Sequence, residues 1–368
     1  MLGKSSGPLE QPYEKIPKKL WNDWRWQIAN RITTAEEIEK FIVLDEHEVT
    51  ALKRGSTFSV TPHYARLLNG EGGSLRRLVI PTEFEYILGR GEETDSLCEE
   101  KYRPVPGVIH RYPHKMLLMA TNFCASKCRY CTRSRLVSED VRSVVCDKTL
   151  DEAFAYLRRT PEIRDVLISG GDPLTLPDEK IDRILGELAQ IKHVEFVRIG
   201  TKTPVVLPQR FTPDLIGILK KYRPLFMSLH FIHPAELSPE TITACNKLAD
   251  AGIPLGSQTV LLKGVNDNPE ILYKLFTELI KSRVKPYYLY QCDPIPGSEH
   301  FRTPIEAGLG IMRSLLGRTT GYAIPQFVVD TGSGKIPLLP NYVTNNDESY
   351  IDLKGFDGLI THYPRIMI

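Results

Sequence analysis

Three of the seven cysteines crowd into eight residues, as Cys124, Cys128 and Cys131. Three thiolates can hold three irons of a [4Fe-4S] cube and leave the fourth iron open. The amino and carboxylate groups of S-adenosylmethionine can chelate that iron, and one electron then cleaves a carbon-sulfur bond to yield a 5'-deoxyadenosyl radical. Structural zinc would need a fourth ligand at comparable spacing, and none stands nearby. The spacing therefore predicts a radical-generating cluster rather than zinc or idle thiols.

Two further features can serve the methionine-derived cofactor. Ser169-Gly170-Gly171-Asp172 follows an apolar run, and its bare backbone lets the methionyl group approach closely. A plain turn at the end of a strand explains the same residues equally well. Tyr130, between the last two cysteines, can lie against the adenine ring, and ordinary packing is an equal alternative.

A lysine leaves a glycine-rich turn near the end of the sequence, in the stretch GSGK that ends at Lys335. A phosphate-cradling nucleotide loop would need glycine where Val329 stands and serine or threonine where Ile336 stands, so that interpretation fails. The other use is a Schiff base with pyridoxal phosphate, because flanking glycines let the lysine swing aside. An ordinary lysine in a surface turn is the plain alternative.

The composition excludes several classes of function. The 368 residues include 47 basic and 45 acidic side chains, a formal net charge of +2, so no strong field points to nucleic acid or an anionic membrane. The first residues lack the apolar core of a signal peptide, and no later run reaches membrane-spanning length. We therefore expect a cytoplasmic protein that acts on a small polar molecule, with no nucleic acid and no membrane as partner.

Short apolar runs alternate with amphipathic stretches from residue 115 onward. The runs begin near residues 116, 166, 196, 226, 256 and 287, so the last five lie 30 or 31 residues apart. Several amphipathic stretches begin with a capping residue, a proline and an acid, as at Thr212, Ser238 and Asn268. This repeat predicts right-handed strand-helix units around a curved parallel sheet. Polar residues just past the strands, such as Lys202 and His230, should then lie on the catalytic face.

Nine stretches run in order nearly from end to end: WNDWRWQ, HRYPHK, CTRSR, SGGDPL, RIGTKTPVVLPQR, AGIPLGSQTVLLKGVND, YLYQCD, EHFRTP and GKIPLLPNYV. Together with the cysteines and the lysine, they resemble the lysine 2,3-aminomutase family of radical S-adenosylmethionine enzymes. The resemblance implies an α/β fold, an incomplete (β/α)6 TIM-like barrel with a helical N-terminal region and a short C-terminal extension. The implied divisions are a helical region at 1–105, the barrel at 106–320 and a segment carrying the cofactor lysine at 321–368.

The resemblance also implies roles for single residues. Lys335 would bind pyridoxal phosphate, and Arg111 and Lys115 would hold the phosphate of that cofactor. The residues expected around S-adenosylmethionine are Ser169, Gly170, Gly171, Asp172, His230 and Gln258. Those expected on the substrate are Arg133 for its α-carboxylate and Asp293 and Asp330 for a side-chain ammonium. Two carboxylates at one mouth favour a cationic side chain and disfavour glutamate.

The implied reaction moves the α-amino group of an L-α-amino acid to the β-carbon. L-lysine is the expected substrate and arginine the runner-up, with a different amino acid or a protein-bound lysine as further alternatives. A flavodoxin or ferredoxin type protein is the expected reductant, and a homo-oligomer the expected assembly. The sequence departs from the family in a shorter glycine-rich turn before Lys335. It also has no cysteine after Cys292, so the structural zinc of some members is not expected.

Two rival classes of protein fit part of the pattern. A radical methylase or methylthiotransferase acting on RNA would carry a basic appendage or a second cysteine cluster, and the sequence shows neither. An electron-transfer protein that keeps the cluster but makes no radical would have no use for Lys335 or Arg133.

Overall fold

A computed structural model describes residues 13, 16–70, 73–137, 145–346 and 350–364. Within these ranges nine strands form one sheet in sequence order, from β1 to β9. Strands β2 to β8 are parallel to one another, while β1 and β9 pair antiparallel with β2 and β8 at the two edges. The strands are β1 (Val108–Tyr112), β2 (Lys115–Thr121), β3 (Asp165–Gly170), β4 (Phe196–Thr201), β5 (Leu225–His230), β6 (Leu255–Leu261), β7 (Lys285–Gln291), β8 (Gln326–Thr331) and β9 (Gly334–Leu338).

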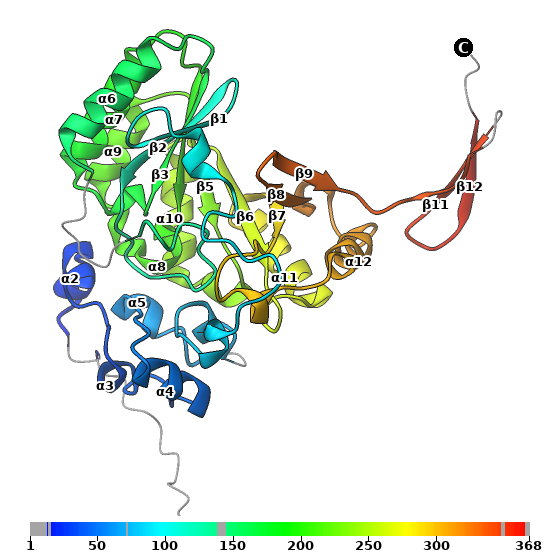
Figure 1. The fold of residues 1–368 in the computed structure, drawn as a ribbon, viewed down its shortest axis with the longest axis horizontal. Coiled ribbons are helices and arrows are strands. Elements are labelled where there is room, and N and C mark those ends of the chain that lie inside the picture. The colour runs from blue at the N-terminus through cyan, green and yellow to red at the C-terminus, as the bar shows by residue number, and fades with distance from the viewer. Residues whose placement is uncertain (1–12, 14–15, 71–72, 138–144, 347–349, 365–368) are drawn as a thin grey trace, which may run out of the picture.

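Each strand from β2 to β7 is followed by a helix that covers the outside of the sheet (Figure 1). These helices are α6 (Asp147–Arg158), α7 (Asp178–Ala189), α9 (Pro213–Lys221), α10 (Pro239–Asp250), α11 (Pro269–Lys281) and α12 (Ile305–Leu315). A short helix, α8 (Thr203–Val206), precedes α9. The six predicted strand-helix units and the barrel-like α/β fold are therefore confirmed.

Local chemistry explains where these helices begin and which face they bury. The side chains of Thr212, Ser238 and Asn268 each accept a hydrogen bond from a backbone N–H in the first turn of the following helix. Such a cap typically contributes about 1 kcal/mol to helix stability. Helix α11 buries Leu272 and Phe276, four residues apart, so one apolar stripe faces the sheet. The predicted caps are confirmed.

The parallel sheet extends one strand beyond the six units. β8 pairs with β7 in parallel, with Leu289 opposite Phe327. β9 then folds back on β8 as a hairpin and carries Lys335. The division at residue 320 stays a prediction, and the segment beyond it contributes a wall of the barrel.

Short helices make up the N-terminal region, which packs beside the cysteine loop (Figure 1). Backbone hydrogen bonds of 2.9 Å join Lys127 N–H to the Ser59 carbonyl and Arg129 N–H to the Leu78 carbonyl. The region therefore closes one side of the loop between Cys124 and Cys131. Its helices are α1 (Lys18–Trp21), α2 (Trp24–Ala29), α3 (Ala35–Ile38), α4 (Glu46–Lys53) and α5 (Pro62–Ala65).

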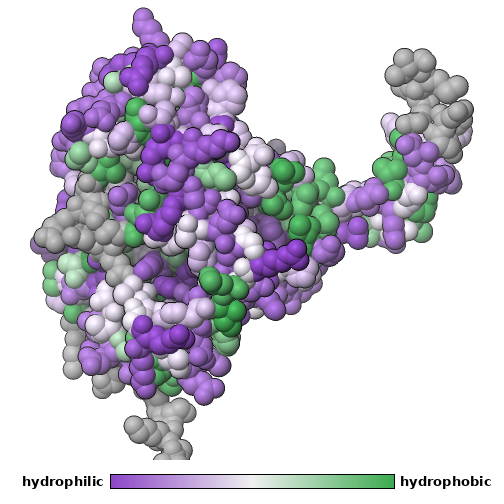
Figure 2. Space-filling view, viewed as in Figure 1, coloured by the Kyte–Doolittle hydropathy of each residue, from purple (hydrophilic) through white to green (hydrophobic). Residues whose placement is uncertain are grey.

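The last described residues form a separate antiparallel sheet of β10 (Val343–Asn346), β11 (Tyr350–Lys354) and β12 (Ile360–Pro364). This sheet projects away from the barrel as an arm (Figure 1). Apolar surface gathers where β9 leaves the body toward it, and Ile336 and Leu339 are 48% and 72% exposed (Figure 2). In the described part of the chain, no helix has the length and apolar character needed to cross a membrane.

Candidate active site

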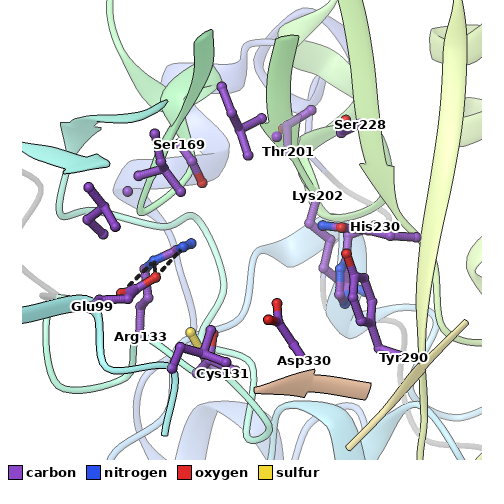
Figure 3. Close-up of a pocket in the computed structure, with 18 of the residues that line it drawn as sticks. Glu99, Cys131, Arg133, Ser169, Thr201, Lys202, Ser228, His230, Tyr290 and Asp330 are labelled. Atoms are coloured by element: carbon purple, nitrogen blue, oxygen red, sulfur yellow. Dashed lines mark hydrogen bonds and ion pairs between the residues drawn. The ribbon is translucent and has the colours of Figure 1, made fainter. Parts of the chain in front are cut away.

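One cavity of about 380 Å³ opens beside the cysteine loop, at the carboxyl ends of the barrel strands (Figure 3). Every residue that the sequence assigned to a cofactor or to the substrate lines this cavity: Arg111, Lys115, Cys124, Cys128, Cys131, Arg133, Ser169, Gly170, Gly171, Asp172, His230, Gln258, Asp293, Asp330 and Lys335. They come from distant parts of the sequence, so closure of the barrel is what brings them together. Their individual roles stay predictions.

The three cysteines form one end of the cavity. All three are free thiols. Burial raises the pKa of the Cys124 thiol well above its ordinary value and that of Cys131 to about 11. Thiols with such a high pKa are poor nucleophiles, whereas a bound metal displaces the proton and compensates the thiolate charge. Three thiols at one end of a cavity, from one short loop, are a donor set that an iron-sulfur cluster uses.

Tyr130 packs face to face with His230 at the same end. The ring centroids lie 5.6 Å apart with planes at 15°, and the phenol oxygen is 3.2 Å from Nε2 of the histidine. Burial, helped by the nearby Lys202 cation, lowers the pKa of His230 well below its ordinary value. The imidazole is therefore neutral at pH 7. The contacts of Tyr130 with His230 support ordinary packing as the role of the Tyr130 ring.

Gly170 and Gly171 press against the end of β2 and the residues that lead from it into the cysteine loop. A Cβ at Gly170 would lie 2.3 Å from the carbonyl oxygen of Thr121, and one at Gly171 would lie 2.3 Å from the carbonyl oxygen of Phe123. Gly170 also has a φ of 115°, in the region that favours glycine. The close approach of the Thr121 and Phe123 backbone therefore requires glycine at both positions. The sequence alone did not reveal this reason.

Asp172 links the ends of β3 and β4. Its carboxylate accepts hydrogen bonds from the Thr201 hydroxyl at 2.7 Å, from the Lys202 N–H at 2.8 Å and from the Leu174 N–H at 3.1 Å. Burial raises the pKa of Asp172, and these hydrogen bonds act in the opposite direction. The geometry makes this side chain a clamp between strand ends, whereas its contact with S-adenosylmethionine stays a prediction.

Lys335 on β9 stands directly across from Asp330 on β8. Its Nζ is 2.7 Å from Oδ2 of Asp330, and Nη2 of Arg111 is 2.6 Å from Oδ1. The Tyr112 hydroxyl accepts the Lys335 backbone N–H at 3.0 Å, and the Tyr112 ring lies 4.3 Å from Nζ of Lys115. A lysine amine with two further cations beside it fits a cofactor that carries both an aldehyde and a phosphate.

Asp293 follows β7 and lines the same side of the cavity. Burial, and then the charge of Asp330, raises the pKa of Asp293 to about 7. Lys335 and Arg111 act in the opposite direction. An approaching ammonium group would favour the ionised form of Asp293, so this side of the cavity is suited to a cation.

Two ion pairs at the cavity were missed by the sequence analysis. Glu99, from the N-terminal region, lies 2.6 Å from Nη2 of Arg133 (Figure 3). Lys202 Nζ lies 2.6 Å from Oε1 of Glu236, which also accepts the Tyr64 hydroxyl at 2.8 Å. The partners stand 34 to 172 residues apart, so no local spacing signals them. Lys202, as a polar residue just past a strand, and Arg133, as an expected substrate ligand, carried a signal, whereas Glu99 and Glu236 carried none.

Comparison with known proteins agrees with this arrangement. The family model described as Radical SAM superfamily matches residues 118–276, and the one described as Lysine-2,3-aminomutase matches residues 312–366. An L-lysine 2,3-aminomutase from Clostridium subterminale is 46% identical over 358 residues, which cover 95% of this chain and 86% of the relative. This chain belongs to the lysine 2,3-aminomutase family.

Two other family members show how the substrates named for them differ. An L-lysine 2,3-aminomutase from Bacillus subtilis is 44% identical, covering 96% of this chain and 76% of the relative. A glutamate 2,3-aminomutase from Clostridioides difficile is 40% identical, covering 92% and 82%. Family membership makes this chain a radical S-adenosylmethionine 2,3-aminomutase, which is an isomerase. The cofactors of the family are a [4Fe-4S] cluster, S-adenosylmethionine and pyridoxal phosphate.

Proposed function

We propose that the substrate is a basic L-α-amino acid, L-lysine in the first place, whose α-amino group moves to the β-carbon. The observation that carries this proposal is the placement of Asp293 and Asp330 in the same cavity as Arg133. The guanidinium suits the α-carboxylate of any amino acid, and the two carboxylates suit a second cation at the far end of the side chain. A glutamate side chain would meet two carboxyl groups there, of which Asp330 already pairs with Arg111 and Lys335.

When bound, the cluster with S-adenosylmethionine supplies the radical that takes hydrogen from the β-carbon, and pyridoxal phosphate supplies the π-system across which nitrogen migrates. The residues of the chain would fix the positions of these cofactors relative to the substrate. Cys124, Cys128 and Cys131 would hold the cluster, and Lys335, which lines the same cavity, would hold the second cofactor. The walls of the cavity would keep water away from the radical, which water would otherwise quench.

The basic residues of the cavity suit two different anionic groups, the phosphate of pyridoxal phosphate and the α-carboxylate of the substrate. We propose Arg111 and Lys115 for the cofactor phosphate and Arg133 for the substrate carboxylate. Arg111 already contacts Asp330, so its contact with a phosphate would be shared with that carboxylate. A flavodoxin or ferredoxin type protein is proposed as the source of the electron, because the cluster requires a donor of low potential. We also propose that the protein assembles as a homo-oligomer.

Arginine is the second candidate substrate, because its guanidinium can pair with both carboxylates in a fork. The test is anaerobic turnover of the iron-loaded chain with lysine, arginine, ornithine and glutamate, scored by product mass and proton spectra. We expect a β-amino isomer of lysine as the fastest product and little or none from glutamate. Faster turnover of glutamate than of either basic amino acid would overturn the assignment of Asp293 and Asp330.

A further inference from the structure

One edge of the Arg133 guanidinium is occupied by a side chain from the N-terminal region. Glu99 Oε1 lies 3.0 Å from Nε and 2.6 Å from Nη2, and Oε2 lies 3.2 Å from Nε (Figure 3). Both residues line the cavity, and Glu99 is only 4% exposed. A guanidinium carries five N–H groups, so the Nη1 side of Arg133 is what this pair leaves for another acceptor.

The structure holds Glu99 firmly in this place. It begins a 3-10 helix, Glu99–Tyr102. The Asp95 carboxylate accepts the backbone N–H groups of Glu99 and Glu100, both at 2.9 Å. Arg135 contacts the same Asp95 at 2.9 Å and so ties this turn to the cysteine loop. The turn that carries Glu99 is therefore held by hydrogen bonds and an ion pair, and Glu99 in turn contacts Arg133.

We propose that Glu99 is a positioning residue that aims Arg133 at the substrate carboxylate and limits how tightly that carboxylate is held. The proposal rests on the proposed function, in which Arg133 receives the α-carboxylate. Glu99 neutralises much of the Arg133 charge and occupies the Nε edge of the guanidinium. The substrate carboxylate can therefore bind only at the Nη1 side. The α- and β-carbons of the substrate are thereby held at one distance from the reacting groups.

If the Glu99 charge is removed, we expect substrate binding and turnover to change in opposite directions. An uncompensated buried guanidinium attracts any available anion more strongly. Its Nε edge then faces a neutral amide, with which the substrate carboxylate can compete for the bidentate contact. Binding should then become tighter, while the β-carbon moves away from its reactive position. Misplacement by about 1 Å can reduce the rate by roughly a hundredfold. A purely structural role for Glu99 would instead weaken binding and turnover together.

The test compares Glu99→Gln with Glu100→Gln in the fully loaded enzyme. Glu100 is on the same 3-10 helix and its loss changes the net charge equally, but among the residues that the structure describes its ion pairs are with Arg103 and Arg135 and none is with Arg133. Glu99 also lies 3.8 Å from Arg135, so this control accounts for the loss of an Arg135 contact. Equilibrium binding is measured by calorimetry with L-lysine and with L-lysinamide, which lacks the carboxylate, and turnover is measured with lysine. For Glu99→Gln we expect binding of lysine at least threefold tighter, unchanged binding of lysinamide and a loss of roughly a hundredfold in kcat. Glu100→Gln should resemble the wild type.

Glu99→Asp serves as a second variant and replaces Glu99→Gln if that variant does not fold. It keeps the charge but is one methylene shorter, so we expect normal binding of lysine and reduced kcat. Weaker lysine binding in Glu99→Gln, equal shifts for lysine and lysinamide, or normal kcat in both Glu99 variants would overturn the proposal. If the wild type prefers a non-basic amino acid, the proposed substrate fails, and the same comparison is made with that amino acid and its amide.

Discussion

Substitution of Asp293 by asparagine should make the protein more stable, and by an amount that grows with pH. Asp293 has an ordinary pKa of 3.8, which burial and then the Asp330 charge raise to about 7 in the folded chain. The folded state therefore binds this proton more tightly than the unfolded state does. Below pH 3.8 the carboxyl is protonated in both states and carries no penalty, whereas above pH 7 the folded state bears the full cost of the charge.

The size of the effect follows from the two pKa values. Between about pH 5 and about pH 8 the wild type should lose about 2 to 3 kcal/mol of stability through this carboxyl alone. Asp293 is only partly buried, and solvent screening reduces the figure to on the order of 2 kcal/mol. Asparagine carries no charge at either pH, so Asp293→Asn should gain that amount over the wild type as the pH rises across this window.

Urea unfolding of the iron-loaded chain without pyridoxal phosphate, followed by tryptophan fluorescence, measures the difference. The matched control is Asp182→Asn on the exposed side of α7, because a hydrogen bond from Tyr222 lowers the pKa of Asp182. That variant should lose a constant amount of stability between about pH 5 and about pH 8, and the loss should shrink only as the pH falls below 3.8. An equal gain for Asp293→Asn at both pH values, or a loss at the higher pH, would refute the electrostatic reasoning. The same ionisation predicts that affinity for lysine rises as the pH increases through 7.

Three further outcomes are expected from other parts of the site. Cys128→Ser should lose most of its iron while Cys98→Ser keeps a normal content, and equal losses by iron analysis would contradict the assigned ligands. Lys335→Ala should retain iron and reductive cleavage of S-adenosylmethionine but form at least about a hundredfold less product, so normal turnover would remove pyridoxal phosphate from the mechanism. Lys202→Met leaves the Glu236 carboxylate buried without its ion pair and should lower the free energy of unfolding by about 3 to 5 kcal/mol. The additional change Glu236→Gln removes the unpaired charge and should restore part of that stability.

The barrel and the location of its chemistry can be predicted from the amino-acid sequence, because the signals for both are local. Apolar runs repeating about every thirty residues, with caps such as Thr212 and Ser238 between them, specify strands and helices without reference to distant contacts. Three cysteines in eight residues can act together in almost any fold that leaves their loop intact. Each of these features depends on residues that are neighbours in the chain, so the order of the residues is enough to indicate it.

Which charged groups meet, and how strongly each one holds its proton, is settled by the tertiary structure. Glu99 reaches Arg133 because the N-terminal region folds over the cysteine loop, and Asp330 faces Lys335 because β9 pairs with β8 in one register. The raised pKa of Asp293 likewise depends on burial and on the charge of Asp330, a neighbour contributed by another strand. Electrostatic energies depend on distance and on exclusion of water, and both quantities are set only when separate segments of the chain pack together.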